Sequence, residues 1–361
     1  MNYLLNDDQT AFVDTARKFL AEHAEPLFLH RIADRHGDWR RDLGDLWQAF
    51  AELGFASLLI AEEDGGTGLS LFDAVLINEV IGASAAPLPF IGHQLCCLAI
   101  AQAGNAEQKA RWLPLLASGE LVGSVALQGR LGSYRPDSWQ AQAGGEKNLT
   151  LANVEVSGSH FPTLIVTGLA GGGLGVVDPQ APSLLRLDKP CVDPIGFLAD
   201  FQVNEGNIEA LANGSTCSQA LVDAGLALQA AQACGGIAKC VELATEYTKV
   251  REQFGVPIGQ FQAVKHQLAE IALEGEPNRP LVWHAAQCVA TGESGASRHA
   301  ALAKAHLADA YLHVARKTIE LHGGFGYTWE ADLHLYLKRA MFLSAHLGSA
   351  LSLRQYLADN R

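Results

Sequence analysis

Two blocks in the C-terminal third of the chain combine residue types that can bind an anion. The first, residues 251–262, reads Arg-Glu-Gln-Phe-Gly-Val-Pro-Ile-Gly-Gln-Phe-Gln, and the second, residues 320–327, reads Glu-Leu-His-Gly-Gly-Phe-Gly-Tyr. The Arg251 guanidinium can form forked hydrogen bonds with phosphate, and Gly323 and Gly324 let backbone N–H groups approach a ligand closely. Each block alone also has a structural explanation, the first as a corner between helices and the second as a glycine cap.

A glycine-rich segment and a row of histidines lack the geometry that phosphate binding and metal binding require. Residues 171–175, Gly-Gly-Gly-Leu-Gly, would need a following helix to receive a phosphate, but prolines follow, so we predict a turn between strands. His299, His306 and His313 share a helix face, but seven residues correspond to ~10.5 Å of rise. No two of these three can therefore share a metal ion, and a subunit-facing or solvated stripe is favoured. We predict no metal site.

Composition is typical of a globular protein with two or three domains. The chain has 361 residues, 48% of them hydrophobic, and 26 Lys and Arg against 39 Asp and Glu give a net charge of −13. Such an acidic chain without a basic stripe is a poor partner for nucleic acid. Because the sequence shows no signal-peptide pattern and no apolar run of ~18 residues, we expect a cytoplasmic protein outside the membrane. The seven cysteines form no CxxC pair, which indicates buried free thiols.

The secondary-structure patterns follow the order helical, β, helical. Residues 1–119 show helical periodicity. Residues 120–212 carry short β-branched runs separated by Gly, Pro and Asp, which predicts a small antiparallel β domain. Residues 213–361 return to helix, with long helices expected at 215–250 and 298–322. The expected fold class is mostly α with a central β domain.

With both C-terminal blocks in a helical region that follows a β region, the chain resembles the acyl-CoA dehydrogenase flavoproteins over nearly its whole length. Residues 251–262 resemble the family's R-x-x-F-G-x-x-x-x-x-x-Q segment, and residues 320–326 resemble its Q-x-x-G-G-x-G segment. Residues 47–71 resemble its N-terminal signature. The resemblance implies three domains, namely an N-terminal helical domain (1–119), a reduced β domain (120–212) and a C-terminal four-helix bundle (213–361).

The resemblance implies that the two C-terminal segments hold the ADP half of FAD for the neighbouring subunit of a dimer. Glu320 departs from the Gln of the family, and a carboxylate near a pyrophosphate is repulsive unless it is protonated or turned away. The residues that the resemblance assigns to this role are Arg251, Gln253, Phe254, Gln262, Glu320, Gly323 and Gly324.

The family's chemistry requires a carboxylate base that removes the α-proton of an acyl-CoA thioester. The family places this glutamate at one of two positions, which correspond here to Leu347 and Gly225, and neither residue can accept a proton. Near these positions, Asp223 and His346 are the weak candidates for a relocated base. Both are more easily interpreted as structural residues, so the sequence locates no catalytic base.

The segments that surround the flavin ring in this family have also lost most of their signature residues here. Residues 126–133 correspond to the T-E-x-x-x-G-S-D segment and keep at most Gly132 and Ser133. Only residues 159–162 remain where the family has an aromatic–Ile–Thr stretch, and Pro162 cannot donate to a β ladder.

This combination favours the hypothesis of a non-catalytic subunit in a heteromeric acyl-CoA dehydrogenase. A second acyl-CoA dehydrogenase-like subunit would supply the base in an α2β2 assembly with two FAD. Residues 322–337 most resemble the degenerate subunits of steroid side-chain dehydrogenases, which implies a steroid side-chain CoA ester as the acyl-CoA substrate. The resemblance also implies a flavoprotein as electron acceptor. Two alternatives stay open, an active homo-oligomer with a relocated base and a scaffold of the same fold that binds no cofactor.

Overall fold

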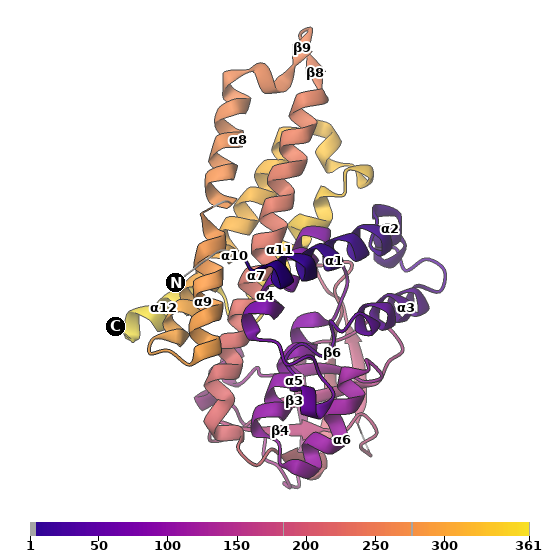
Figure 1. The fold of residues 1–361 in the computed structure, drawn as a ribbon, viewed down its shortest axis with the longest axis vertical. Coiled ribbons are helices and arrows are strands. Elements are labelled where there is room, and N and C mark those ends of the chain that lie inside the picture. The colour runs from indigo at the N-terminus through magenta and orange to yellow at the C-terminus, as the bar shows by residue number, and fades with distance from the viewer. Residues whose placement is uncertain (1–4, 183, 276, 361) are drawn as a thin grey trace.

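A group of N-terminal helices, two small sheets and a C-terminal helical bundle follow one another along the chain (Figure 1). The computed structural model describes residues 5–182, 184–275 and 277–360. The predicted fold class, mostly α with a central β domain, is confirmed by this order of elements.

The N-terminal region is helical because each helix combines a polar start with an apolar face. The Asn6 side chain accepts a hydrogen bond from the backbone N–H of Gln9, whose own side chain accepts from the Asn6 N–H. Trp47 and Phe50 on the third helix are completely buried in the core. The helices are α1 (Asp7–His23), α2 (Pro26–Ala33), α3 (Trp39–Glu52), α4 (Leu71–Ser84), α5 (Phe90–Ala103) and α6 (Ala106–Ala117).

The central region forms two sheets with the strand orders β1-β3-β4-β7 and β2-β6-β5. The predicted glycine turn is confirmed, because Gly171 and Gly172 connect β3 to β4 with positive φ angles. The prediction of an antiparallel unit was wrong for β1 and β3, which pair in parallel because the chain crosses to β2 in the other sheet between them. The strands are β1 (Val122–Ala126), β2 (Asn148–Glu155), β3 (Thr163–Leu169), β4 (Gly173–Val177), β5 (Leu185–Lys189), β6 (Leu198–Asn204) and β7 (Ile208–Ala210).

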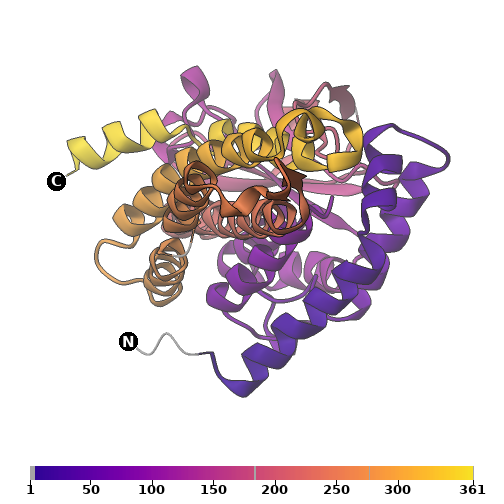
Figure 2. The same ribbon diagram turned by 90° about the horizontal axis from the view of Figure 1, so that it is seen from above.

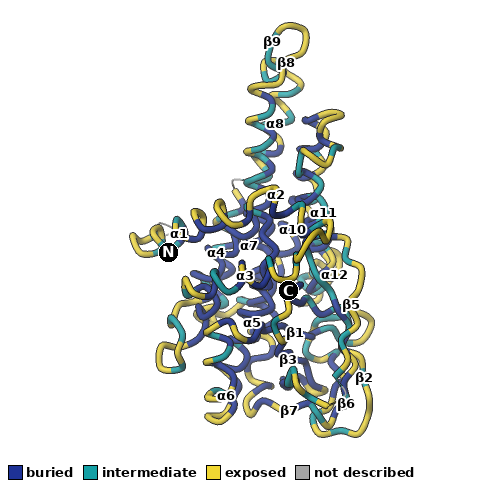
Figure 3. Tube along the Cα trace, turned by 90° about the vertical axis from the view of Figure 1, so that its right-hand side faces the viewer, coloured by how far each residue is buried: buried dark blue, intermediate teal, exposed yellow. Residues whose placement is uncertain are grey.

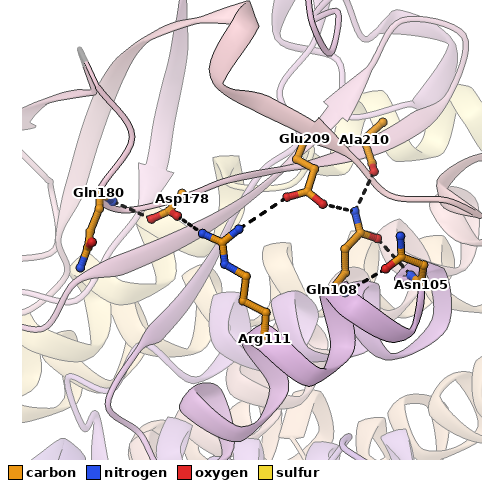
Figure 4. Close-up of polar contacts among 7 residues, drawn as sticks. All are labelled: Asn105, Gln108, Arg111, Asp178, Gln180, Glu209 and Ala210. Carbon is orange, nitrogen blue, oxygen red and sulfur yellow. Dashed lines mark hydrogen bonds and ion pairs between the residues drawn. The ribbon is translucent and has the colours of Figure 1, made fainter.

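Helix α6 is joined to the first sheet by side-chain contacts (Figure 4). The Gln108 amide nitrogen donates to a Glu209 carboxylate oxygen at 2.6 Å and to the Ala210 carbonyl at 2.9 Å. Arg111 pairs with Asp178, which directly follows β4, at 2.5 Å. These contacts fix the sheet against the N-terminal helices.

The C-terminal bundle is built around α7 (Gly214–Val250), the long helix that the sequence predicts. This helix is long and apolar enough to span a membrane by length and composition, but 94% of its most apolar window is buried in the protein. Gly82 lets α4 approach α7 closely, since an added Cβ would lie 2.0 Å from the Gln232 carbonyl oxygen. The other elements are β8 (Glu252–Gln253), β9 (Val256–Pro257), α8 (Gln262–Gly275), α9 (Asn278–Thr291), α10 (Ala296–His322), α11 (Leu333–Ala345) and α12 (Ala350–Asp359).

Candidate functional site

The β8–β9 hairpin forms the tip of the bundle, at the end away from the β domain (Figures 1 and 3). Arg251 caps the C-terminus of α7, and Phe254 and Gly255 then turn the chain with φ angles of 55° and 80°. Left-handed backbone costs an aromatic residue steric strain that glycine avoids. Phe254 is also 93% exposed. A strained and exposed aromatic at a tip has the character of a contact residue for another molecule.

A hollow of about 580 Å³ opens beside this hairpin, between the end of α7 and the turn that follows α10. Seen from above, the end of the bundle that carries this hairpin faces the viewer (Figure 2). Of the seven residues assigned to FAD by resemblance, five line the hollow and two, Phe254 and Gln262, do not. The five are Arg251, Gln253, Glu320, Gly323 and Gly324.

The residues of this hollow fit the ADP half of FAD. An added Cβ at Gly323 or Gly324 would meet no atom within 4 Å, so a phosphate has room to approach the backbone there. The Tyr247 ring stacks on His322 with centroids 4.2 Å apart and lies parallel to Phe325 at 5.9 Å, which offers a flat wall to an aromatic base. The exposed guanidinium at the end of α7 supplies the positive charge.

Glu320, the residue that departs from the family pattern, has its charge compensated locally. One of its carboxylate oxygens accepts from the Lys317 ammonium group at 2.7 Å. The same contact raises the pKa of Lys317, which keeps that side chain charged. A cation beside Glu320 weakens the repulsion that its carboxylate would exert on a phosphate.

The two positions to which the resemblance assigns the base lie in contact with each other. An added Cβ at Gly225 of α7 would lie 2.9 Å from a methyl carbon of Leu347, which follows α11, and 3.2 Å from one of Leu95. Leu347 is 3% exposed and Leu95 is completely buried. Two positions far apart in the sequence thus meet at one place, and apolar side chains fill that place.

Asp223 lies two residues before this contact and is hydrogen-bonded on both carboxylate oxygens. Gln219, one turn earlier on α7, donates to one oxygen at 2.9 Å, and the Ser297 hydroxyl donates to the other at 2.5 Å. Burial raises the pKa of Asp223, although both hydrogen bonds oppose the shift. The residue joins the start of α10 to α7, as expected of a structural carboxylate.

His346 is buried directly before Leu347. The Gln229 amide nitrogen donates to its Nδ1 at 2.7 Å, and Phe342 stacks on its ring at a centroid distance of 4.9 Å. Burial, with a smaller contribution from Lys304, lowers the pKa of His346 to about 3. The imidazole is therefore neutral at physiological pH and accepts a hydrogen bond at Nδ1.

Glu155, at the end of β2, is a candidate that the sequence reasoning missed. One of its carboxylate oxygens lies 3.8 Å from His346 Nδ1, and about a fifth of its side chain is exposed. Burial raises the pKa of Glu155 to about 7, with Arg339 opposing and Asp193 adding to the shift. In the sequence Glu155 stands in an alternating Val-Glu-Val run, which is typical of a solvent-facing strand position, so no local signal separates it from an ordinary surface carboxylate.

Further charged groups lie buried around Glu155. Arg339 pairs with Asp193, and the Lys304 ammonium nitrogen donates to the Leu343 carbonyl. Burial lowers the pKa of Lys304 to about 7. The burial of these groups was not predictable from local sequence, because it depends on the packing of α10 and α11 against the β domain.

The segment that corresponds to the family's flavin-ring signature, and keeps at most Gly132 and Ser133 of it, forms a surface loop after β1. Leu131 is fully exposed and has a φ of 54°, and Gly132 follows with a φ of 75°. Tyr134, at the end of the loop, turns inward and lies edge-on to His346 with ring centroids 6.2 Å apart. This loop therefore reaches the buried region through an aromatic ring.

The expected histidine stripe is confirmed only in part. His306 and His313 are exposed, but His299 is half-buried and faces α9, where its ligand atoms come within 4.8 Å of those of His284 and Cys288. Sequence spacing on one helix could not show this group, because two of its members come from a different helix. Six of the seven cysteines are buried and none of the seven forms a disulfide, as predicted, whereas Cys191 is half-buried.

Comparisons with known proteins agree with this architecture. Residues 6–120 match the N-terminal domain and residues 213–360 the C-terminal domain of acyl-CoA dehydrogenases. Acyl-CoA dehydrogenase IpdE2 of Mycobacterium tuberculosis is 29% identical over 331 residues, covering 91% of this chain and 89% of that protein. A solved variant of the Tcur3481–Tcur3483 steroid ACAD is 28% identical with a TM-score of 0.84, covering 98% of this chain and 97% of that one.

The cofactor of the family is seen in a further neighbour of the same fold. The structure of PigA with FAD and proline has a TM-score of 0.85 at 19% identity, and the match covers 100% of this chain and 99% of that one. The two domain matches together span most of the sequence, and the chain belongs to the acyl-CoA dehydrogenase family, whose cofactor is FAD.

Proposed function

We propose that this chain is the non-catalytic subunit of a heteromeric acyl-CoA dehydrogenase and that it completes the FAD site of its partner. The observation that carries the proposal is the contact of Gly225 with Leu347, which leaves both base positions of the family without a carboxylate. A base must come within about 3 Å of the proton that it removes. The apolar contact between these positions provides neither the charge nor the space for that step.

The open hollow at the tip supports the other half of the proposal. Arg251 would pair with the pyrophosphate of the partner's FAD, and the backbone at Gly323 and Gly324 would approach its oxygens. Phe254 would contact the partner subunit, which accounts for an exposed aromatic ring at the tip. Bound FAD would supply the acceptor for the β-hydrogen of the acyl-CoA as hydride, and the partner's carboxylate would take the α-proton to give an α,β-unsaturated thioester.

The substrate that we propose is a steroid side-chain CoA ester, with a flavoprotein as electron acceptor. Support comes from the neighbour described as a steroid ACAD, whose name also joins two components. The two components in that name suit an assembly of two kinds of subunit, for which we propose an α2β2 arrangement with two FAD. We further propose that this assembly is cytoplasmic.

Co-expression tests the proposal by the colour of the protein. The chain purified alone should be colourless, and the chain co-purified with an acyl-CoA dehydrogenase-like partner subunit should be yellow, with about two FAD per four chains. FAD retained by the chain alone would contradict a shared site. A colourless complex would contradict it as well and favour a scaffold of the same fold.

Glu155 favours a second candidate, an active homo-oligomer with a relocated base. Its pKa of about 7 suits a general base, and it lies beside His346 at the vacated base position. This candidate requires that the chain alone bind FAD and that acyl-CoA reduce it. The replacement Glu155→Gln should then slow flavin reduction by ~10²–10⁴-fold, whereas Asp223→Asn and His346→Gln test the two candidates from the sequence in the same assay.

A further inference from the structure

The corner between α9 and α10 gathers metal-binding side chains at the end of the bundle away from the tip. His284 and Cys288 are one turn apart on the same face of α9, and His299 lies at the end of the first turn of α10. Gly292 and Gly295, with φ angles of 65° and 88°, reverse the chain in a short connection. This turn sets the first residues of α10 against the last turns of α9.

The distances in this group are close to those of a tetrahedral metal site. The ligand atoms of His284, Cys288 and His299 all lie within 4.8 Å of one another, and Cys288 Sγ is 3.6 Å from His284 Nε2. The two imidazole rings meet at a centroid distance of 4.5 Å. A tetrahedral zinc ion with bonds of ~2.0–2.3 Å holds its ligand atoms ~3.3–3.8 Å apart. Small side-chain rotations therefore suffice to bring the three ligands around one ion.

Glu293 adds a fourth potential ligand from the connection itself. One of its carboxylate oxygens lies 3.6 Å from Cys288 Sγ, and the other accepts from the Thr291 hydroxyl at 3.1 Å. The side chain is thus already directed toward the sulfur by a hydrogen bond of the kind that orients ligands from the outer shell of metal sites.

We propose that His284, Cys288, Glu293 and His299 form a binding site for one divalent transition-metal ion of the zinc class. Thiolate and imidazole ligands favour zinc, cobalt or nickel over magnesium and calcium, which prefer oxygen. With one thiolate, one carboxylate and two neutral imidazoles, the charge of the ligands balances that of the ion.

Binding of an ion would require the Cys288 thiol to lose its proton. Burial raises the pKa of the Cys288 thiol, with Glu293 adding to the shift, so the sulfur carries a proton before an ion binds. Burial lowers the pKa of His299, with His284 and Arg298 adding to the shift, so its imidazole is neutral and free to bind. The sulfur–metal bond forms as the S–H bond breaks, and one proton per ion is released to solvent.

The site acts on the fold rather than on the reaction. Glu320 lies 21 positions after His299 on α10, which corresponds to ~30 Å of helix, so the ion is remote from the hollow at the tip. Ser297, in the first turn of α10, donates to Asp223 of α7. An ion at the corner would fix this turn and, through it, the packing of α10 on α7. The inference is therefore independent of the proposed function.

Zinc titration of the full-length protein, first depleted with a chelator, tests the site. We expect one tightly bound zinc per chain, release of one proton, and a higher Tm with zinc than without it. Cys288→Ser and His299→Gln should each weaken zinc binding by at least ~100-fold. The control variants Cys191→Ser and His313→Gln, which alter a thiol and an exposed imidazole elsewhere, should bind zinc like the original protein.

Cobalt provides a second readout that needs no variant. Cobalt bound at this site should give a thiolate-to-metal charge-transfer band and the intense visible absorption of tetrahedral geometry. The proposal is overturned if the original protein retains no zinc, if cobalt shows no thiolate band, or if folded Cys288→Ser binds zinc as tightly as Cys191→Ser. Circular dichroism of each variant establishes that it is folded.

Discussion

Helix α7 passes through two opposite surroundings along its length. Near its start, Gly225 packs against Leu347 and Leu95 in a region closed by apolar side chains. At its end, Arg251 is exposed beside a hollow of about 580 Å³ whose glycines face open space. In the proposed function, the closed region is where the chain would need its own base, and the open region serves the cofactor of a partner.

The difference between these regions separates two requirements that usually occur together in one enzyme chain. A reaction centre needs a positioned acid–base group and space for substrate. A cofactor-completing surface needs only charge, exposed backbone and a complementary shape. A chain can therefore lose the first and keep the second, provided that another subunit supplies the base.

The largest expected effect comes from placing a carboxylate in the closed region. Leu347→Glu should lower the free energy of unfolding by about 4 kcal/mol, because the new charge would be buried without a partner. Leu351→Glu makes the same change at a side chain that is 78% exposed and should cost less than about 0.5 kcal/mol. Denaturant unfolding measures both. Equal effects at the two positions would mean that the region around Leu347 is open to water, as the tip is.

The pH dependence of the free energy of unfolding should distinguish Glu155 from an ordinary surface carboxylate. Because the pKa of Glu155 is raised to about 7 in the folded protein, the unfolded chain binds fewer protons between pH ~4.5 and ~7, and stability falls as the pH rises through this window. Glu155→Gln removes the buried charge and should stabilise the protein by up to about 3 kcal/mol above pH 7, with little effect below pH 4.5. Unfolding measured at pH 4.5 and pH 8 gives the comparison, and Glu120→Gln is the exposed control. The same stabilisation at both pH values would contradict the raised pKa.

At the open end, Arg251→Ala should weaken FAD binding by the co-purified complex. Loss of a charge-assisted hydrogen bond costs about 2 kcal/mol, which corresponds to ~30-fold in affinity. Arg316→Ala removes an exposed guanidinium from α10 outside the hollow and should leave FAD affinity unchanged. Fluorescence titration of the FAD-depleted complex measures both. If the Arg251→Ala complex binds FAD as tightly as the Arg316→Ala complex, the tip of the bundle does not contribute to the FAD site.

The smallest effect is expected at Glu320. Its carboxylate is exposed and paired with Lys317, so Glu320→Gln should tighten FAD binding by only about twofold, as repulsion of the pyrophosphate is relieved and Lys317 is freed. Glu242→Gln, which breaks an equally short pair with Lys239, is the matched control on α7. Weaker FAD binding by the Glu320→Gln complex would instead mean that the carboxylate itself contacts the cofactor.

The order of helical and β regions was predictable because it depends on local patterns, whereas the assignment of the tip residues to FAD came from the family resemblance and stays a prediction. Helical periodicity placed α7 and α10 almost to the residue, and the two C-terminal blocks fall at helix ends, where turns have characteristic glycines. Five of the seven residues assigned to FAD accordingly line one hollow. The parallel pairing of β1 with β3 was not predictable, because it depends on a crossover between two sheets.

The buried charged groups were not predictable for a related reason. Glu155, Lys304 and the pair Asp193–Arg339 come from distant parts of the sequence, and only tertiary packing removes them from water. The group of His284 and Cys288 with His299 was missed likewise, since His299 was interpreted only with the other histidines of its own helix.

The rate of flavin reduction by acyl-CoA in the co-purified complex tests the central claim most directly. The claim is that this chain supplies cofactor contacts but no base, and Glu155, whose pKa is raised to about 7, is a carboxylate suited to compete for that role. We predict that Glu155→Gln leaves the single-turnover rate within about twofold of the original complex. A fall of ~10²-fold or more, the effect of losing a general base, with FAD content unchanged, would contradict the claim and place the base in this chain.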